Sequence, residues 1–171
     1  NAAVQGASGL VHAVAESVDA RGMIGGQVAD IESEQLQGRS SDRDALVDTL
    51  RFIHENKTGK LLRGSVALGG LLGGASEEQL SLLDEYGRAL GLAFQIVDDL
   101  LDIEETSATL GKSAGKDVAQ GKLTWPSLFG ADDARRELQH LLETAVARAD
   151  MINGSVNYLG AIARYVCERR S

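Results

Sequence analysis

Residues 95–102 read Gln-Ile-Val-Asp-Asp-Leu-Leu-Asp and hold three carboxylates inside an apolar run. At about 100° per residue, a helix places Gln95, Asp98 and Asp102 on one stripe and turns Asp99 to the side. Carboxylates this close repel one another, and their burial is costly unless a cation faces them. Mg²⁺ takes oxygen ligands and is usually held by one or two carboxylates together with substrate phosphates. The stretch therefore predicts a helix that carries a magnesium site; the alternative is a solvated acidic face in which Asp102 serves the helix end.

The sequence on either side of this helix predicts an all-α fold. Apolar residues recur at helical spacing, and the single proline indicates long uninterrupted helices, because an interior proline costs a helix about 3 kcal/mol. No alternating strand pattern is present. The expected helices cover residues 2–18, 23–35, 42–72, 76–105, 132–151 and 155–168, with a short helix opened by Pro126 and a loop over 107–122. In the third of these, the apolar stripe is expected at Leu46, Leu50, Ile53 and Leu61.

Composition excludes some classes of function. The chain has 25 acidic and 17 basic residues, a net charge of −8, which is the opposite of the balance usual in nucleic-acid binders. The single cysteine, Cys167, allows no internal disulfide and no multi-cysteine metal site, which favours a reducing, cytoplasmic setting. No apolar run is long enough to span a membrane. Asn1 already lies in a predicted helix, so an N-terminal part is expected to be missing, and organellar targeting stays open.

A second candidate site is residues 54–59, His-Glu-Asn-Lys-Thr-Gly. On a regular helix His54, Lys57 and Leu61 share a face, and Thr58 lies beside them. An ammonium group next to a hydroxyl suits a phosphate oxygen; the alternative is a solvent-exposed lysine.

A third candidate is the segment 111–122, in which Lys112, Lys116 and Lys122 lie among glycines directly after the acidic helix. Such a loop predicts a lid that captures an anion. Its Gly-Lys-Ser triplet is not a P-loop, because Thr106 stands where the required upstream glycine would be. Glu137 and His140 have the spacing of half a di-iron motif, but one copy on a polar helix face predicts no metal.

Taken in order, four stretches resemble the trans-isoprenyl diphosphate synthases, or polyprenyl synthetases. Residues 22–30 are similar to the family's GMxGGQxxD, 54–59 to its HxxKTG, 91–102 to its second aspartate-rich motif GxAFQxxDDxLD, and 109–126 to its TLGK–GKD–GKxTxP region. The family's first aspartate-rich motif is absent. The resemblance therefore makes the whole chain, 1–171, the C-terminal part of a single domain whose N-terminal helices are missing.

The resemblance implies an isoprenoid-synthase-type helical bundle around a central cavity, with two acidic motifs facing each other across its mouth. Three Mg²⁺ ions would bridge them to an allylic diphosphate. Ionisation, head-to-tail attack by isopentenyl diphosphate and loss of a proton would give a longer trans-prenyl diphosphate. A homodimer is expected, and the chain alone is expected to be inactive without the missing N-terminal segment. The alternatives are a non-catalytic, synthase-like regulatory subunit and, less in keeping with the HxxKTG stretch, a terpene cyclase of the same fold.

The resemblance also implies roles for individual residues. The expected metal ligands, direct or through water, are Asp98, Asp99, Asp102 and Asp117. The lysines expected to bind the allylic diphosphate are Lys57, Lys112 and Lys122. The residues expected to present oxygens to the cation are Gln27, Thr58 and Gln95. Of these, the ones expected to act in catalysis are Lys57, Thr58, Gln95 and Lys112. Phe94 is expected to line the cavity near the isopentenyl diphosphate.

Overall fold

The computed structural model describes residues 2–36, 42–110, 122–152 and 157–169, and within these ranges the chain is helical and has no strand. The all-α prediction is confirmed. The elements in chain order are α1 (Ala2–Val18), α2 (Met23–Leu36), α3 (Arg43–His54), the π-helical turn η1 (Glu55–Gly59), α4 (Lys60–Leu72), α5 (Glu77–Leu110), α6 (Trp125–Phe129), α7 (Ala131–Ile152) and α8 (Tyr158–Glu168).

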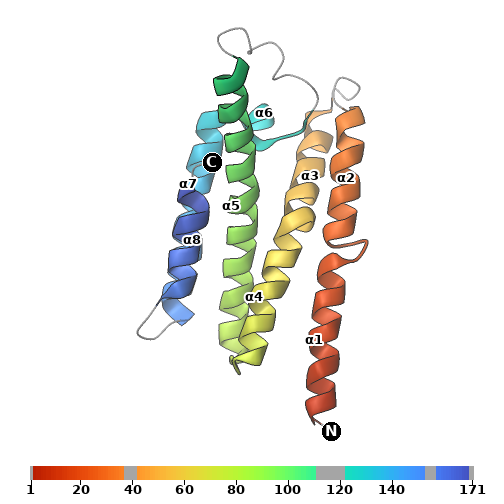
Figure 1. The fold of residues 1–171 in the computed structure, drawn as a ribbon, viewed down its shortest axis with the longest axis vertical. Helices are drawn as coiled ribbons and strands as arrows, with labels where there is room; N and C mark the ends of the chain where they lie inside the picture. Colours follow the sequence, from red (N-terminus) through yellow and green to blue (C-terminus); the bar gives the residue numbers. More distant parts are fainter. Residues whose placement is uncertain (1, 37–41, 111–121, 153–156, 170–171) are drawn as a thin grey trace.

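The long helices stand side by side as a row (Figure 1). α7 and α8 pack on one side of α5, and α4 packs on the other side. α1 and α2 complete the row beyond α4 and α3. The short α6 lies near the top of the row, where it contacts α5 and α7, and Arg43 of α3 donates a hydrogen bond to the carbonyl of Leu128, 2.8 Å away. The top of the row is therefore the place where segments distant in sequence converge.

The core lies between α5, α7 and α8. Tyr86, Ala93 and Ile96 of α5 have no exposed surface. The same is true of Ala134, Ala149 and Ala163 of the neighbouring helices α7 and α8. Small alanines let the helices approach, and the Tyr86 hydroxyl donates a hydrogen bond to the carbonyl of Leu159 at 2.8 Å. Burial, with a smaller contribution from Cys167, raises the pKa of Tyr86 to about 12, so the phenol stays neutral.

Helix ends follow capping chemistry. Ser76 and Gln79 form the expected capping box: the Gln79 amide donates to Ser76 Oγ and the Ser76 amide donates to Gln79 Oε1. α5 runs to Leu110, so residues 107–110 continue the helix rather than beginning the expected loop. The remainder of that loop, 111–121, lies outside the described residues. α8 begins at Tyr158, after an Asn157 cap, rather than at 155.

The predicted regular helix 42–72 is interrupted by the π-helical turn η1. A π turn bonds i to i+5 and adds a residue to one turn, which rotates everything after it by about one residue. The stripe predicted through Leu61 is therefore broken: Leu50 and Ile53 are buried, but Leu61 is 39% exposed. Within the turn Asn56 faces inward and donates to the carbonyl of Phe52 at 2.8 Å.

Two glycines hold this turn between α2 and α5. A Cβ on Gly26 would lie 2.2 Å from the backbone nitrogen of Lys57, and a Cβ on Gly91 would lie 2.6 Å from the Cα of Gly59. Backbone meets backbone at both contacts, so neither neighbour can move aside like the end of a flexible side chain. The glycines therefore fix how closely α2 and α5 approach the segment that carries Lys57 and Thr58.

Substituting Gly91 with alanine is expected to lower the free energy of unfolding by about 1–3 kcal/mol, because the new methyl group overlaps Gly59. Urea denaturation followed by circular dichroism measures the change. The control is Gly69→Ala in α4, where an added Cβ has open space; the alanine there should stabilise the helix by about 0.5–1 kcal/mol. Equal effects of the two substitutions would contradict the close contact.

Candidate functional site

A polar cavity of about 130 Å³ lies where α2, η1, α5 and the segment before α6 meet. The residues that line it come from four parts of the sequence: Asp30, Ile53, His54, Lys57, Thr58, Gln95, Asp98, Asp99, Lys122 and Leu123. Six of the predicted site residues, Lys57, Thr58, Gln95, Asp98, Asp99 and Lys122, are thus brought to one place. The geometry of each charged group follows from the element that carries it.

Lys57 forms an ion pair with Asp30 of α2, with its Nζ 2.5 Å from Oδ2. The Asp30 side chain is 13% exposed and the Lys57 side chain 29%, so water screens the pair less than it screens a surface pair. Asp30 is absent from the residues to which the sequence analysis assigned a role. The sequence does hold a signal for Asp30: it lies three residues after Gln27, and therefore about one helical turn further along the same face of α2.

Asp99 is buried and faces protein donors. Its Oδ2 accepts a hydrogen bond from the backbone nitrogen of Trp125 at 2.8 Å, and His54 Nε2 lies 3.2 Å from the same oxygen. The His54 ring stacks on Trp125 with centroids 6.3 Å apart. The Asp99 and His54 side chains are only 7% and 3% exposed. Asp99 therefore joins the acidic helix to the start of α6.

Asp98 points toward the C-terminal end of the chain. It pairs with Arg169, directly after α8, whose guanidinium also lies 4.1 Å from the centroid of the Phe94 ring. Burial raises the pKa of Asp98, Arg169 opposes the rise, and the charges of Asp102 and Asp99 add to it. The ionised carboxylate therefore needs a cation, and Arg169 supplies one. Sequence analysis gave Arg169 no role.

Asp102 lies one turn further along α5 and pairs with Lys122, whose Nζ is 3.1 Å from Oδ2. Burial alone would lower the pKa of Lys122, but the hydrogen bond to Asp102 and the charges of Asp102, Asp99 and Asp30 outweigh it and raise the pKa. Lys122 is therefore a firmly held cation at the edge of the cavity.

The remaining predicted residues are placed as follows. Gln95 is buried in the cavity wall, and Phe94 lies beneath Arg169. Gln27 is exposed on α2 and is not part of the lining of this cavity. Lys112 and Asp117 lie outside the described residues. Their roles, and the metal and substrate roles of the others, stay predictions.

The acidic helix fits part of a magnesium site. Asp98 and Asp102 are one turn apart on the same face, and their side chains are 43% and 56% exposed. Across the described ranges, no three His, Cys, Asp or Glu side chains are grouped so that they alone could hold a metal. Mg²⁺ needs only one or two protein carboxylates when phosphate oxygens and water complete its shell. The donor set is therefore suited to a metal that arrives with a diphosphate.

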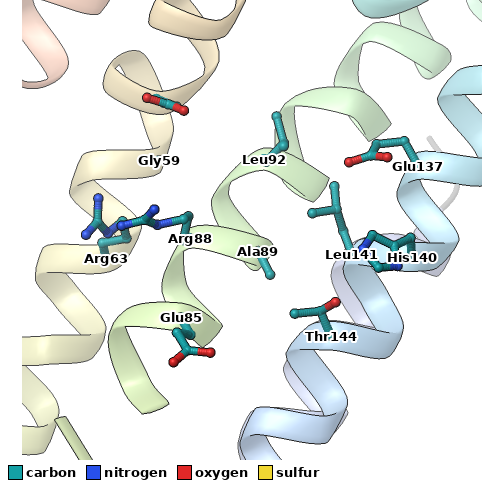
Figure 2. A pocket seen from close by; sticks show the side chains of 11 residues that line it. Gly59, Arg63, Glu85, Arg88, Ala89, Leu92, Glu137, His140, Leu141 and Thr144 are labelled. Atoms are coloured by element: carbon teal, nitrogen blue, oxygen red, sulfur yellow. The ribbon is translucent and has the colours of Figure 1, made fainter. Parts of the chain in front are cut away.

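A larger cavity, about 520 Å³, lies between α4, α5 and α7 nearer the N-terminal end of α5 (Figure 2). Its two arginines, Arg63 and Arg88, lie side by side and both pair with Asp84, at 2.6 and 3.6 Å. Glu137 and His140 lie on the opposite wall. Acidic and basic side chains are mixed around an apolar floor, without the facing carboxylates and lysines of the smaller cavity. The smaller cavity is therefore the candidate site.

Comparison with known proteins gives the family. Residues 6–160 match the Polyprenyl synthetase family. The chain belongs to this family. It is 42% identical over 160 residues to a dimethylallyltranstransferase of Fischerella ambigua, and 40% identical over 162 residues to a geranylgeranyl diphosphate synthase of Cyanophora paradoxa. These matches cover 94% and 95% of this chain but only 44% and 52% of the relatives. The chain thus spans about half the length of the curated relatives it matches.

Solved structures agree with this placement. An FPP/GFPP synthase from Zymomonas mobilis superposes with a TM-score of 0.76 at 30% identity, covering 95% of this chain and 51% of that one. Within the described ranges, no helix of this family member is both long and apolar enough to cross a membrane. A relative from Catharanthus roseus is described as chloroplastic, so the expected cytoplasmic location stays a prediction. The expected homodimer also stays a prediction.

Replacing Asp30 with asparagine is expected to lower the free energy of unfolding by about 1–2 kcal/mol, because Lys57 loses a partly buried charged partner. Urea denaturation at neutral pH measures it. The matched control is Glu85→Gln, which removes the carboxylate of the Arg148–Glu85 pair at the same 2.5 Å separation but on the surface. The control should change stability by less than about 0.5 kcal/mol. An equal loss in both variants would show that burial of the Lys57–Asp30 pair adds nothing.

Proposed function

We propose that the chain is the C-terminal half of a magnesium-dependent prenyl diphosphate synthase. The reaction is the head-to-tail condensation of isopentenyl diphosphate with an allylic diphosphate to give a longer trans-prenyl diphosphate. The observation that carries the proposal is the convergence of Lys57, Lys122 and Asp98 in the lining of one small polar cavity, with Asp102 paired to Lys122 beside it. Membership of the polyprenyl synthetase family supports it.

The charges around the cavity suit a diphosphate that arrives with metal. Three carboxylates, those of Asp30, Asp98 and Asp102, pair with the permanent cations Lys57, Arg169 and Lys122, and the carboxylate of Asp99 faces His54. When a diphosphate enters, it offers the two lysines a stronger anionic partner than a single carboxylate. Asp98 and Asp102 are then available to hold magnesium. In this structure these lysines and carboxylates are held in ion pairs, which contacts to the diphosphate and the metal would replace.

Magnesium, when bound at Asp98 and Asp102, would neutralise the negative charge that develops on the leaving diphosphate. Lys57 and Lys122 add fixed positive charge at the same diphosphate. Thr58 and Gln95, both in the cavity wall, present oxygens toward the positive charge that forms on the allylic carbon. Lys112 and Asp117, on the segment 111–121, are proposed to complete the diphosphate and metal contacts.

The proposed activity requires more than this half of the domain. The relatives are roughly twice as long as the part matched here, and the family's first aspartate-rich motif is not found in the sequence. We propose that the other half supplies the second set of metal ligands and the isopentenyl diphosphate site. The 171-residue chain alone should therefore bind a diphosphate weakly and should not elongate a prenyl chain.

Magnesium-dependent binding of inorganic pyrophosphate tests the site. Isothermal titration calorimetry of the chain should detect binding with Mg²⁺ and none with EDTA. Asp98→Asn should weaken this binding at least about tenfold, because it removes a carboxylate that holds the metal. Asp132→Asn is the control, since Asp132 is 92% exposed at the start of α7. A non-catalytic partner need not bind, so wild-type-like binding by Asp98→Asn, or no binding by either protein, would count against the proposal.

A chain-elongation assay tests the need for the other half. Radiolabelled isopentenyl diphosphate and geranyl diphosphate are incubated with Mg²⁺ and the purified chain. No longer prenyl diphosphate is expected above the enzyme-free blank, because half the metal ligands are lacking. Product formation by the chain alone would overturn this part of the proposal.

A further inference from the structure

We infer that His54 is a positioning residue, which acts through Asp99 and Trp125 to hold Lys122 against the acidic helix. The inference rests on the proposed function for what Lys122 binds, but not for the contacts themselves. His54 has no role in the site proposed above, where the ammonium and hydroxyl groups of its neighbours bind the substrate. Its contacts give it a different one.

The His54 ring lies within hydrogen-bond distance of Asp99. A carboxylate oxygen accepts hydrogen bonds, so a bond between His54 Nε2 and Asp99 Oδ2, which lie 3.2 Å apart, would need the imidazole proton on Nε2. His54 Nδ1 is buried and has no hydrogen-bond partner within the described part of the chain. The ring is therefore oriented by Asp99 on one edge and by the stacked Trp125 ring on its face.

Asp99 also binds the backbone of Trp125, which follows the 111–121 segment in the sequence. The same Oδ2 that faces His54 accepts the N–H of Trp125 at 2.8 Å. The Trp125 N–H and the neighbouring His54 ring meet the same carboxylate oxygen, so together they restrict its rotation more than either would alone. Trp125 is the first residue of α6, so Asp99 determines where that helix starts.

Lys122 lies three residues before Trp125, and this short stretch crosses the edge of the cavity. Leu123 and Thr124 are buried, and Thr124 caps α6 through its hydroxyl, which accepts from the Ser127 amide. A stretch that is pinned at Trp125 and packed at Leu123 has little freedom at residue 122. Lys122 Nζ is thereby delivered to Asp102 Oδ2 at 3.1 Å. Asp99 thus serves the diphosphate-binding lysine, in addition to any metal role.

The experiment uses a matched pair of substitutions at His54. His54→Met has a side chain of similar volume but lacks the N–H donor, whereas His54→Gln keeps an N–H at a similar reach. We call the contacts of His54 and Asp99 with Trp125 the clamp. Trp125 is the single tryptophan of the chain, so its fluorescence reports directly whether the clamp holds it in place. His54→Met should shift the emission to longer wavelength and increase acrylamide quenching; His54→Gln should resemble the wild type.

Binding provides the second readout. With Mg²⁺ and inorganic pyrophosphate, His54→Met should weaken binding about tenfold, as loss of a supporting residue commonly does. The double variant His54→Met/Lys122→Met should bind no more weakly than Lys122→Met alone, because His54 acts through that lysine. His140→Met, the same substitution at an exposed histidine, should change neither readout.

Each outcome decides the inference. Unchanged Trp125 fluorescence in folded His54→Met, or additive losses in the double variant, would overturn it. If His54→Met does not fold, His54→Gln decides: an exposed Trp125 in that folded variant would overturn the clamp, and a wild-type-like Trp125 supports it. If the unsubstituted chain binds no pyrophosphate, the proposed function fails, and the fluorescence comparison alone still decides whether His54 holds Trp125.

Discussion

The arrangement of the site depends on the close packing of backbone against backbone around the π-helical turn. Gly26 of α2 contacts Lys57, and Gly91 of α5 contacts Gly59, at distances that leave no room for a Cβ. The turn is thus held from two sides by rigid helices. Side chains built on rigid elements are positioned more closely than those on loops, which matters because a displacement of about 1 Å is costly in a catalytic site. Lys57 and Thr58 owe their place to these two glycines.

The charges of the cavity are organised in pairs that serve two purposes. In this structure Asp30, Asp98 and Asp102 each neutralise a cation, and these cations are Lys57, Arg169 and Lys122. Unpaired, such partly buried charges would cost free energy. In the proposed reaction, Lys57 and Lys122 would contact the diphosphate, and Asp98 and Asp102 would contact magnesium. Asp99 differs from the other three, because buried protein donors rather than an exposed cation satisfy its oxygen.

How much the sequence predicts depends on the range of the interaction. Helices with local periodicity, such as 2–18 and 132–151, are reproduced nearly to the residue, and so is the capping box at Ser76, because both depend on neighbours within a few positions. Of the predicted face shared by His54, Lys57 and Leu61, His54 and Lys57 line one cavity, whereas Leu61, which follows the π turn, is 39% exposed. A π turn is stabilised by what packs against it, and the sequence of one helix does not contain that information. The extension of α5 to Leu110 was missed because the small residues after Glu105 are typical of loops.

For the candidate site, the residue types and spacing of 54–59 and 91–102 by themselves predict carboxylates for a divalent cation and a lysine for a phosphate, and these roles stay predictions. Apolar periodicity along the whole chain determined the all-α fold, since it is a property of each segment alone. The tertiary structure alone determined which groups pair. Asp30 meets Lys57 across 27 positions and Arg169 reaches Asp98 across 71. His54, Asp99 and Trp125 form one cluster although they lie on three elements. Contacts between distant segments arise from helix packing, and no local pattern encodes them.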